Sequence, residues 1–210
     1  MIKIYTFVIC LFIFSSCTTI NIESIKQVPK IINLKNNQPL PEIYEDKEFN
    51  YMIYTSKGKS YQTLKNVNDN NGVLEWIDKN EHTYLTLNGK LIRSYGTEND
   101  FNIMFNNDFT NKLYVDGTSI KTNIIFENPN SGSLDIYFTY KVLKSDFIKL
   151  KSSSKKIKIN LVEEKFDVPK IFWRGANYYW INEEYGVIKS KQNIHPFKSK
   201  LHLETLKTVD

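Results

Sequence analysis

Three histidines and two pairs of adjacent glutamates are the residues of this 210-residue chain best suited to acid–base chemistry. His82, His195 and His202 stand at no spacing that would let them share a metal ion with each other or with a carboxylate. The doublets Glu163-Glu164 and Glu183-Glu184 lie in or beside predicted strands, where neighbouring side chains point to opposite faces. We therefore interpret both doublets as solvated strand ends rather than as a catalytic acid and base.

The sequence also has no motif for nucleophilic catalysis or for phosphate binding. The serines at 152–154 lack the residues of a nucleophile elbow, and the sequence contains no glycine loop of the phosphate-cradling type. His195 precedes Pro196 in a predicted turn, which indicates an exposed or locally hydrogen-bonded imidazole. The sequence thus predicts no enzyme, no metal site and no other cofactor.

Two groups of residues could instead bind a ligand. The first group is the aromatic residues, because sugars can stack on aromatic rings. A β-rich core also needs large aromatic side chains, so core packing is the alternative for each tryptophan. The second group is the segment 141–170, where nine lysines stand against four acidic residues. This segment could meet acidic polysaccharide or lipid phosphates, or form a solvated face that discourages strand pairing. The candidate contacts with a glycan or a protein partner are Trp76, Tyr84, Arg93, Trp173, Tyr178 and Trp180.

The N-terminus has the pattern of an export signal. Lys3 precedes an apolar run of eleven residues, 4–14, which is too short to span a bilayer easily. The following Phe-Ser-Ser-Cys resembles a bacterial lipobox, so we predict a signal peptide over 1–16 and lipid attachment at Cys17. Thr18, in place of aspartate, favours the outer membrane. The alternatives are an ordinary signal peptide and an uncleaved anchor.

The clearest folding signal is the hairpin around Asn88-Gly89. Both residues tolerate positive φ, which a two-residue type I′ turn requires. The predicted register opposes Leu85 to Ile92 and Tyr84 to Arg93. It places Leu85, Leu87, Ile92 and the stem of Lys90 on one apolar face, and Tyr84, Thr86 and Arg93 on the other.

The rest of the chain repeats short alternating runs separated by turn residues. We predict an all-β fold, an antiparallel meander of about ten to twelve strands that forms a sandwich or a partly open barrel with little helix. One helical turn is expected within 97–107, and a strand over 112–115. Residues 17–46, with three prolines, are predicted to be a lipidated, flexible tether, and residues 47–210 a single β-rich domain.

Two blocks of sequence carry a family resemblance. The first comprises Trp76-Ile77, the hairpin 84–96 and Asn99-Asp100-Phe101; the second runs from Asn177 through Gln192 to a proline and a closing strand. Their order and spacing, together with the lipobox, resemble the YjbF/GfcB lipoproteins of group 4 capsule and exopolysaccharide clusters. The segment 110–165 matches that family only in its strand character.

The resemblance implies an outer-membrane lipoprotein with a periplasmic domain that assists capsule or exopolysaccharide export. It implies docking to an outer-membrane β-barrel exporter and no established catalytic residues. A periplasmic lipoprotein that contacts the polysaccharide directly is the alternative. Without Lys3 the mature chain has 27 basic and 23 acidic residues, a mild excess that does not favour a nucleic-acid partner.

Overall fold

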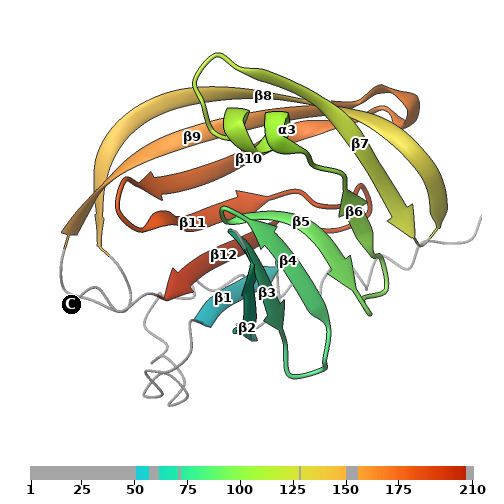
Figure 1. Cartoon of the computed structure of the whole chain (residues 1–210), viewed down its shortest axis with the longest axis horizontal. Coiled ribbons are helices and arrows are strands. Elements are labelled where there is room, and N and C mark those ends of the chain that lie inside the picture. The colour runs from blue at the N-terminus through green and yellow to red at the C-terminus, as the bar shows by residue number, and fades with distance from the viewer. Residues whose placement is uncertain (1–50, 57–61, 71, 128, 150–155, 207–210) are drawn as a thin grey trace, which may run out of the picture. The chain divides into compact units, whose positions relative to one another are not determined.

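The computed structural model describes residues 51–56, 62–70, 72–127, 129–149 and 156–206 (Figure 1). The chain divides into two compact units, residues 1–42 and 43–210, and every described residue belongs to the second. The predicted signal peptide, the tether and Cys17 all lie outside the described residues.

The described part of the chain contains twelve strands and one short α-helix, which confirms the all-β prediction. The strands are β1 (Tyr51–Ser56), β2 (Gln62–Asn70), β3 (Val73–Ile77), β4 (Thr83–Leu87), β5 (Lys90–Tyr95), β6 (Phe101–Ile103), β7 (Ser119–Glu127), β8 (Asn130–Lys149), β9 (Lys156–Val168), β10 (Trp173–Asn182), β11 (Gly186–Gln192) and β12 (Leu201–Leu206). The helix is α3 (Asn107–Lys112), and a 3-10 turn, η2 (Pro169–Ile171), precedes β10.

The sheet is an antiparallel meander that curls into a barrel. Each strand pairs with its neighbours in sequence, and β1 also pairs with β12, so the strand order forms a ring. The pairing is shortest between β5 and β6, where Arg93 and Asn102 are the one pair in register among the described residues. Of the two predicted architectures, the barrel is therefore correct and the sandwich is not.

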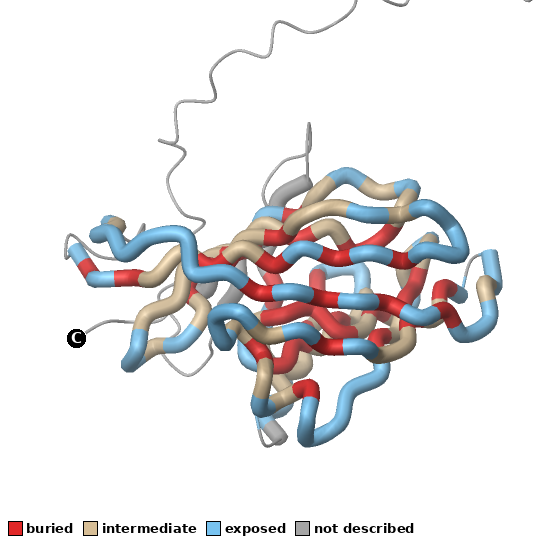
Figure 2. Tube along the Cα trace, turned by 90° about the horizontal axis from the view of Figure 1, so that it is seen from above, coloured by how far each residue is buried: buried red, intermediate tan, exposed pale blue. Residues whose placement is uncertain are grey.

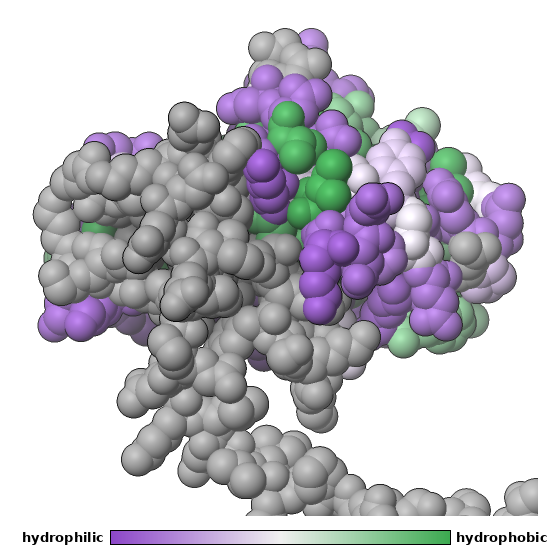
Figure 3. Space-filling model, turned by 90° about the horizontal axis from the view of Figure 1, so that it is seen from below, coloured by the Kyte–Doolittle hydropathy of each residue, from purple (hydrophilic) through white to green (hydrophobic). Residues whose placement is uncertain are grey.

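The interior is filled by alternate side chains of the strands. Along β8, Leu134, Ile136, Phe138 and Tyr140 are buried, and the residues between them are exposed, as the alternation predicts (Figure 2). Each such apolar side chain contributes roughly 1.5–3 kcal/mol by leaving water. Seen from below, the described surface is mostly hydrophilic, with a small hydrophobic group among the polar residues (Figure 3).

The central hairpin forms with the predicted turn but with a different register. Asn88 and Gly89 have φ values of 48° and 81°. A β-bulge then shifts the register, so Leu85 opposes Arg93 and Tyr84 opposes Ser94. The extra residue, which the alternation could not reveal, changes which side chains face inward. Tyr84 and Thr86, predicted on the polar face with Arg93, are in fact buried.

The segment before β7 also differs from the prediction. Residues 101–103 form strand β6, and the helix comes later, over 107–112, where a strand was partly expected. Asn106 begins this helix by accepting a hydrogen bond from the backbone N–H of Phe109 at 2.9 Å. Asp100 accepts bonds from Thr97 N and from the Thr97 and Ser94 hydroxyls, which holds residues 97–100 in a loop.

Candidate functional site

The most heavily bonded polar group in the described structure is the carboxylate of Glu164, on β9. Its relative exposure is 0%, and that of Lys90, on β5, is 1%. The ammonium of Lys90 donates to both carboxylate oxygens at 2.6 Å. Burial lowers the pKa of Lys90, and the charge of Glu164 opposes part of that shift. One buried ion pair thus joins two residues that are 74 positions apart in the sequence.

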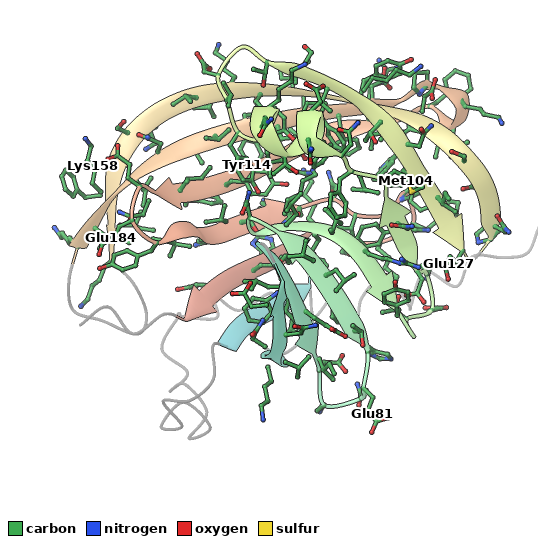
Figure 4. The ribbon with its side chains drawn as sticks, viewed as in Figure 1. Glu81, Met104, Tyr114, Glu127, Lys158 and Glu184 are labelled. Carbon is green, nitrogen blue, oxygen red and sulfur yellow. The ribbon has the colours of Figure 1, made fainter. Side chains whose placement is uncertain are left out.

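Three further side chains donate hydrogen bonds to the same carboxylate. They are Tyr140 at 2.7 Å, Asn177 at 2.6 Å and Tyr179 at 3.3 Å. Burial, followed by the negative charge of Glu164, raises the pKa of both tyrosines well above the usual value. Tyr114 packs its ring against those two tyrosines and lies beneath α3 (Figure 4).

Gln192, on β11, attaches the hairpin tip to the same group. Its amide oxygen accepts from Leu91 N at 3.0 Å and from Tyr179 at 3.3 Å, and its amide nitrogen donates to Gly89 O at 3.0 Å. A Cβ placed on Gly89 would lie 2.4 Å from the Cβ of Val187, so only glycine permits this approach. We call Lys90, Tyr140, Glu164, Asn177, Tyr179 and Gln192 the central network.

The central network is closed to substrate chemistry. Its carboxylate already accepts from four side chains, which leaves no free acceptor for a substrate proton. Among the described residues, no three histidine, cysteine or acidic side chains cluster as metal ligands would. A cavity of about 50 Å³ lies elsewhere and is lined by Lys158, Ile159, Asn160, Ile181, Asn182 and Glu183.

The sequence did not lead us to predict that Glu164 is buried. For Lys90 we predicted an apolar environment for the stem but not for the ammonium. Glu164 is not a solvated strand end, because it takes an inward position between Val162 and Phe166. That alternation with two apolar residues was the available signal. The ammonium of Lys90 is buried with its stem, 4.0 Å from the centre of the Phe138 ring. Glu183 and Glu184, by contrast, are exposed beside the β10–β11 turn, as predicted.

The structure does not bring the six predicted contact residues together. Trp76 and Tyr84 are buried in the core, where the Trp76 indole donates to Thr86 at 2.9 Å. Trp173 is half-buried against Phe126 and Phe166. Trp76 therefore packs in the core, which was the alternative considered for each tryptophan, and Trp173 does so in part.

The other three predicted residues are partly exposed. Tyr178 donates to Glu163 at 3.1 Å, and the ammonium of Lys189 lies 5.4 Å from the Trp180 ring. Both rings alternate with the buried Tyr179 and so share the outer face of β10. Arg93, on β5, stacks at 4.1 Å on the ring of Tyr95.

An exposed apolar surface follows the end of β8. Tyr140 still exchanges backbone hydrogen bonds with Gly117 and Thr118 on the β7 side. Beyond it, β8 has no register partner on that side within the described residues, while its pairing with β9 continues to Lys149. The exposed residues here are Val115, Val142, Leu143 and Phe147, which we call the β8 edge patch. Asp116 accepts from Val142 N at 2.7 Å, and Asp146 accepts from Phe147 N at 2.8 Å, so two edge amides are occupied.

These features define a class: a meander β-barrel with a filled, hydrogen-bonded interior and an apolar patch on one strand edge. No helix in the described ranges is long and apolar enough to cross a membrane. The profile of the family described as group 4 capsule polysaccharide lipoprotein GfcB, YjbF, matches residues 49–206. The chain belongs to this family of lipoproteins, as the two sequence blocks predicted.

A solved structure supports the fold. The hypothetical lipoprotein YmcC from Escherichia coli K12 superposes with a TM-score of 0.68 at 12% identity, over 80% of this chain and 93% of that one. A protein from Bacteroides fragilis, described as exported with a YmcC-like fold, has a TM-score of 0.37 at 10% identity, over 75% of this chain and 92% of its own. A protein from Parabacteroides distasonis described as a lipoprotein has 0.38 at 11% identity with the same coverage. No curated protein sequence matches the chain.

Proposed function

We propose that this protein is a non-enzymatic accessory lipoprotein of capsule or exopolysaccharide export. It is anchored in the outer membrane through Cys17 and docks its periplasmic domain to an outer-membrane β-barrel exporter. The β8 edge patch is the observation that supports docking. Family membership supports the polysaccharide context and the lipid anchor, and the closed central network supports a role without catalysis.

The β8 edge patch has the composition of a protein-binding surface. Phe147 is 65% exposed, and Leu143 is 43% exposed on the same strand. Exposed apolar residues that follow an unpaired strand edge can receive a strand from another protein, whose backbone supplies the hydrogen bonds. The Lys144–Asp146 ion pair is exposed at this edge and, like other surface pairs, contributes little, because water and salt screen the two charges. A partner strand can therefore displace Asp146 from Phe147 N at small cost.

The docking proposal is tested by recovering the lipidated protein from detergent-solubilised outer membrane and identifying what comes with it by mass spectrometry. We expect a large β-barrel protein in near-equal amount. Leu143→Asp with Phe147→Asp should reduce that recovery tenfold or more. Phe105→Asp is the matched control, because Phe105 is 46% exposed outside the patch. Undiminished recovery of the barrel protein by the double variant would contradict docking through this edge.

The same fractionation tests the anchor. Cys17→Ala removes the thiol that would carry the lipid, so the variant should leave the outer-membrane fraction and surface polysaccharide should fall. Normal outer-membrane fractionation of Cys17→Ala would refute the lipid attachment, whatever the result for β8.

A further inference from the structure

Two phenylalanines stand out from one end of the barrel. Phe172, in the β9–β10 connection, is 85% exposed, and Phe197, in the β11–β12 connection, is 77% exposed. These are the most exposed large hydrophobic side chains among the described residues. Val168 opposes Trp173 and Gln192 opposes Leu201, so both connections lie at the same end of their antiparallel strands.

Phe172 is held in an unfavourable backbone conformation. It is a left-handed residue with φ 53° and ψ 27°, at the end of the 3-10 turn η2, where its N–H donates to Pro169 O at 3.1 Å. A non-glycine residue is sterically disfavoured there, and the exposed ring recovers little of that cost by packing. Such strain at an exposed aromatic side chain motivates a hypothesis of function.

A rigid aromatic base supports both connections. Trp173 packs on Phe166 and Phe126, with ring centres 4.5 and 5.6 Å apart, and the His195 imidazole meets Phe126 at 4.8 Å. His195 in turn accepts from Phe197 N through Nδ1 at 3.2 Å. The Phe197 ring therefore stands on this cluster, 5.5 Å from the centre of the His195 ring, and Phe172 adjoins the cluster through the next residue in the chain, Trp173.

Basic residues flank each exposed ring. Lys170 and Arg174 lie on either side of Phe172 in sequence, and Lys198 follows Phe197. Burial, and then the charge of Lys198, lowers the pKa of His195 to about 4, so the imidazole adds no charge at neutral pH. We call Lys170, Phe172, Arg174, Phe197 and Lys198 the aromatic rim. Asp167, exposed on β9, is the register partner of Arg174, and the exposed Glu81, Glu98 and Glu127 lie in or beside other connections at this end.

The rim lies at the opposite end of the barrel from the start of β1. Tyr51 opposes Leu206, whereas Ser56 opposes Leu201, next to the β11–β12 connection. The chain therefore enters the barrel at the end away from the rim.

We propose that the aromatic rim binds an anionic polysaccharide. The C–H faces of two sugar rings would stack on Phe172 and Phe197, and sugar carboxylates would pair with Lys170, Arg174 and Lys198. The inference rests on the proposed function only in that it takes the exported polymer as the natural ligand. It moves the direct-contact site from the rings predicted by sequence to two connections that the sequence analysis did not select.

The test is a binding titration of the lipidated protein in nanodiscs with polygalacturonate, and with uncharged dextran for comparison. We expect polygalacturonate to bind and dextran to bind at least tenfold more weakly. Phe172→Gly combined with Phe197→Ser should weaken polygalacturonate binding tenfold or more. Phe147→Ser is the matched control, an exposed phenylalanine outside the rim, and should bind as wild type.

Stability and charge separate a binding role from a structural one. Phe172→Gly relieves the left-handed strain, so the unfolding midpoint should not fall while binding does. Lys170→Gln with Arg174→Gln should weaken binding and reduce its dependence on salt, because fewer charge pairs are screened. Parallel loss of stability and binding in Phe172→Gly would contradict the proposal.

Two outcomes would overturn the assignment. One is equal binding of polygalacturonate by wild type and the double phenylalanine variant. The other is stronger binding to phosphatidylglycerol vesicles than to polygalacturonate, lost in that variant, which would make the rim a lipid-binding surface. Recovery of the barrel partner by the double phenylalanine variant should be normal, so docking and polymer binding can fail separately.

Discussion

The central network and the aromatic rim use the same residue types in opposite ways. Inside the barrel, Lys90 finds a carboxylate at 2.6 Å and an aromatic face at 4.0 Å, all within the fold. At the rim, phenylalanine and basic side chains are arranged side by side, but the rings face solvent. The difference shows that residue type alone does not identify a binding site. What distinguishes the two regions is whether the aromatic rings are packed inside the fold or exposed to solvent.

The comparison is tested most severely by removing one charge from the network. Lys90→Met leaves Glu164 buried without its cation, which should lower the free energy of unfolding by about 3–5 kcal/mol. Denaturant unfolding followed by circular dichroism measures this. Lys144→Met, which breaks the exposed pair with Asp146, should lower the free energy of unfolding far less, because solvent screens a surface pair.

The double variant Lys90→Met, Glu164→Leu completes that experiment. Replacing both charges by apolar groups should cost less than removing either one, because no buried charge is left unpaired. If Lys90→Met were as stable as Lys144→Met, the contrast between a self-sufficient interior and an exposed rim would be lost.

A smaller effect is expected where the hairpin tip reaches the network. Gly89→Ala combines a left-handed backbone with a Cβ 2.4 Å from that of Val187, and the overpacking alone should cost about 1–3 kcal/mol. Gly132→Ala is the control, because Gly132 has φ 61° and no atom within 4 Å of its added Cβ. The difference between their unfolding midpoints isolates the contact with Val187. Equal midpoints would mean that the hairpin tip is free to move.

A pH-dependent effect concerns the base of the rim. The pKa of His195 is about 4 in the folded protein, against 6.5 ordinarily, so between these values the unfolded chain binds more protons. Stability should therefore rise with pH from about 4 to about 6.5 and gain nothing from this residue above that. Urea midpoints of wild type and His195→Asn over this range measure the contribution. Parallel curves would show that the imidazole is not buried in a neutral form.

Local signals in the sequence predicted much of the fold. The positive φ values of Asn88 and Gly89 follow from residue type. The bulge in β5 could not be foreseen, because an extra residue is selected by contacts across the barrel. The helix was misplaced since Asn106, rather than Thr97, provides the N-terminal cap.

The candidate sites were harder to predict, because they depend on which strands become neighbours. Glu164 and Lys90 meet only when β5 and β9 face each other across the interior. The sequence analysis chose Trp76, Trp173 and Trp180 as contact residues because their rings are large, but large rings also favour core positions. The residues that surround each ring decide whether it packs in the core or is available to a ligand. Phe172 has no distinguishing neighbour in sequence, and only its backbone conformation and exposure reveal it.

The pairing of β1 with β12 also governs when the barrel can form. Residue 51 meets residue 206, so the closing contact joins the two ends of the domain. Contacts of such long sequence separation form late and make folding slow. The last strand of the described chain, β12, is therefore the one that closes the ring. Completion of the barrel is thus tied to the arrival of the C-terminal strand, and a chain that lacks β12 cannot close.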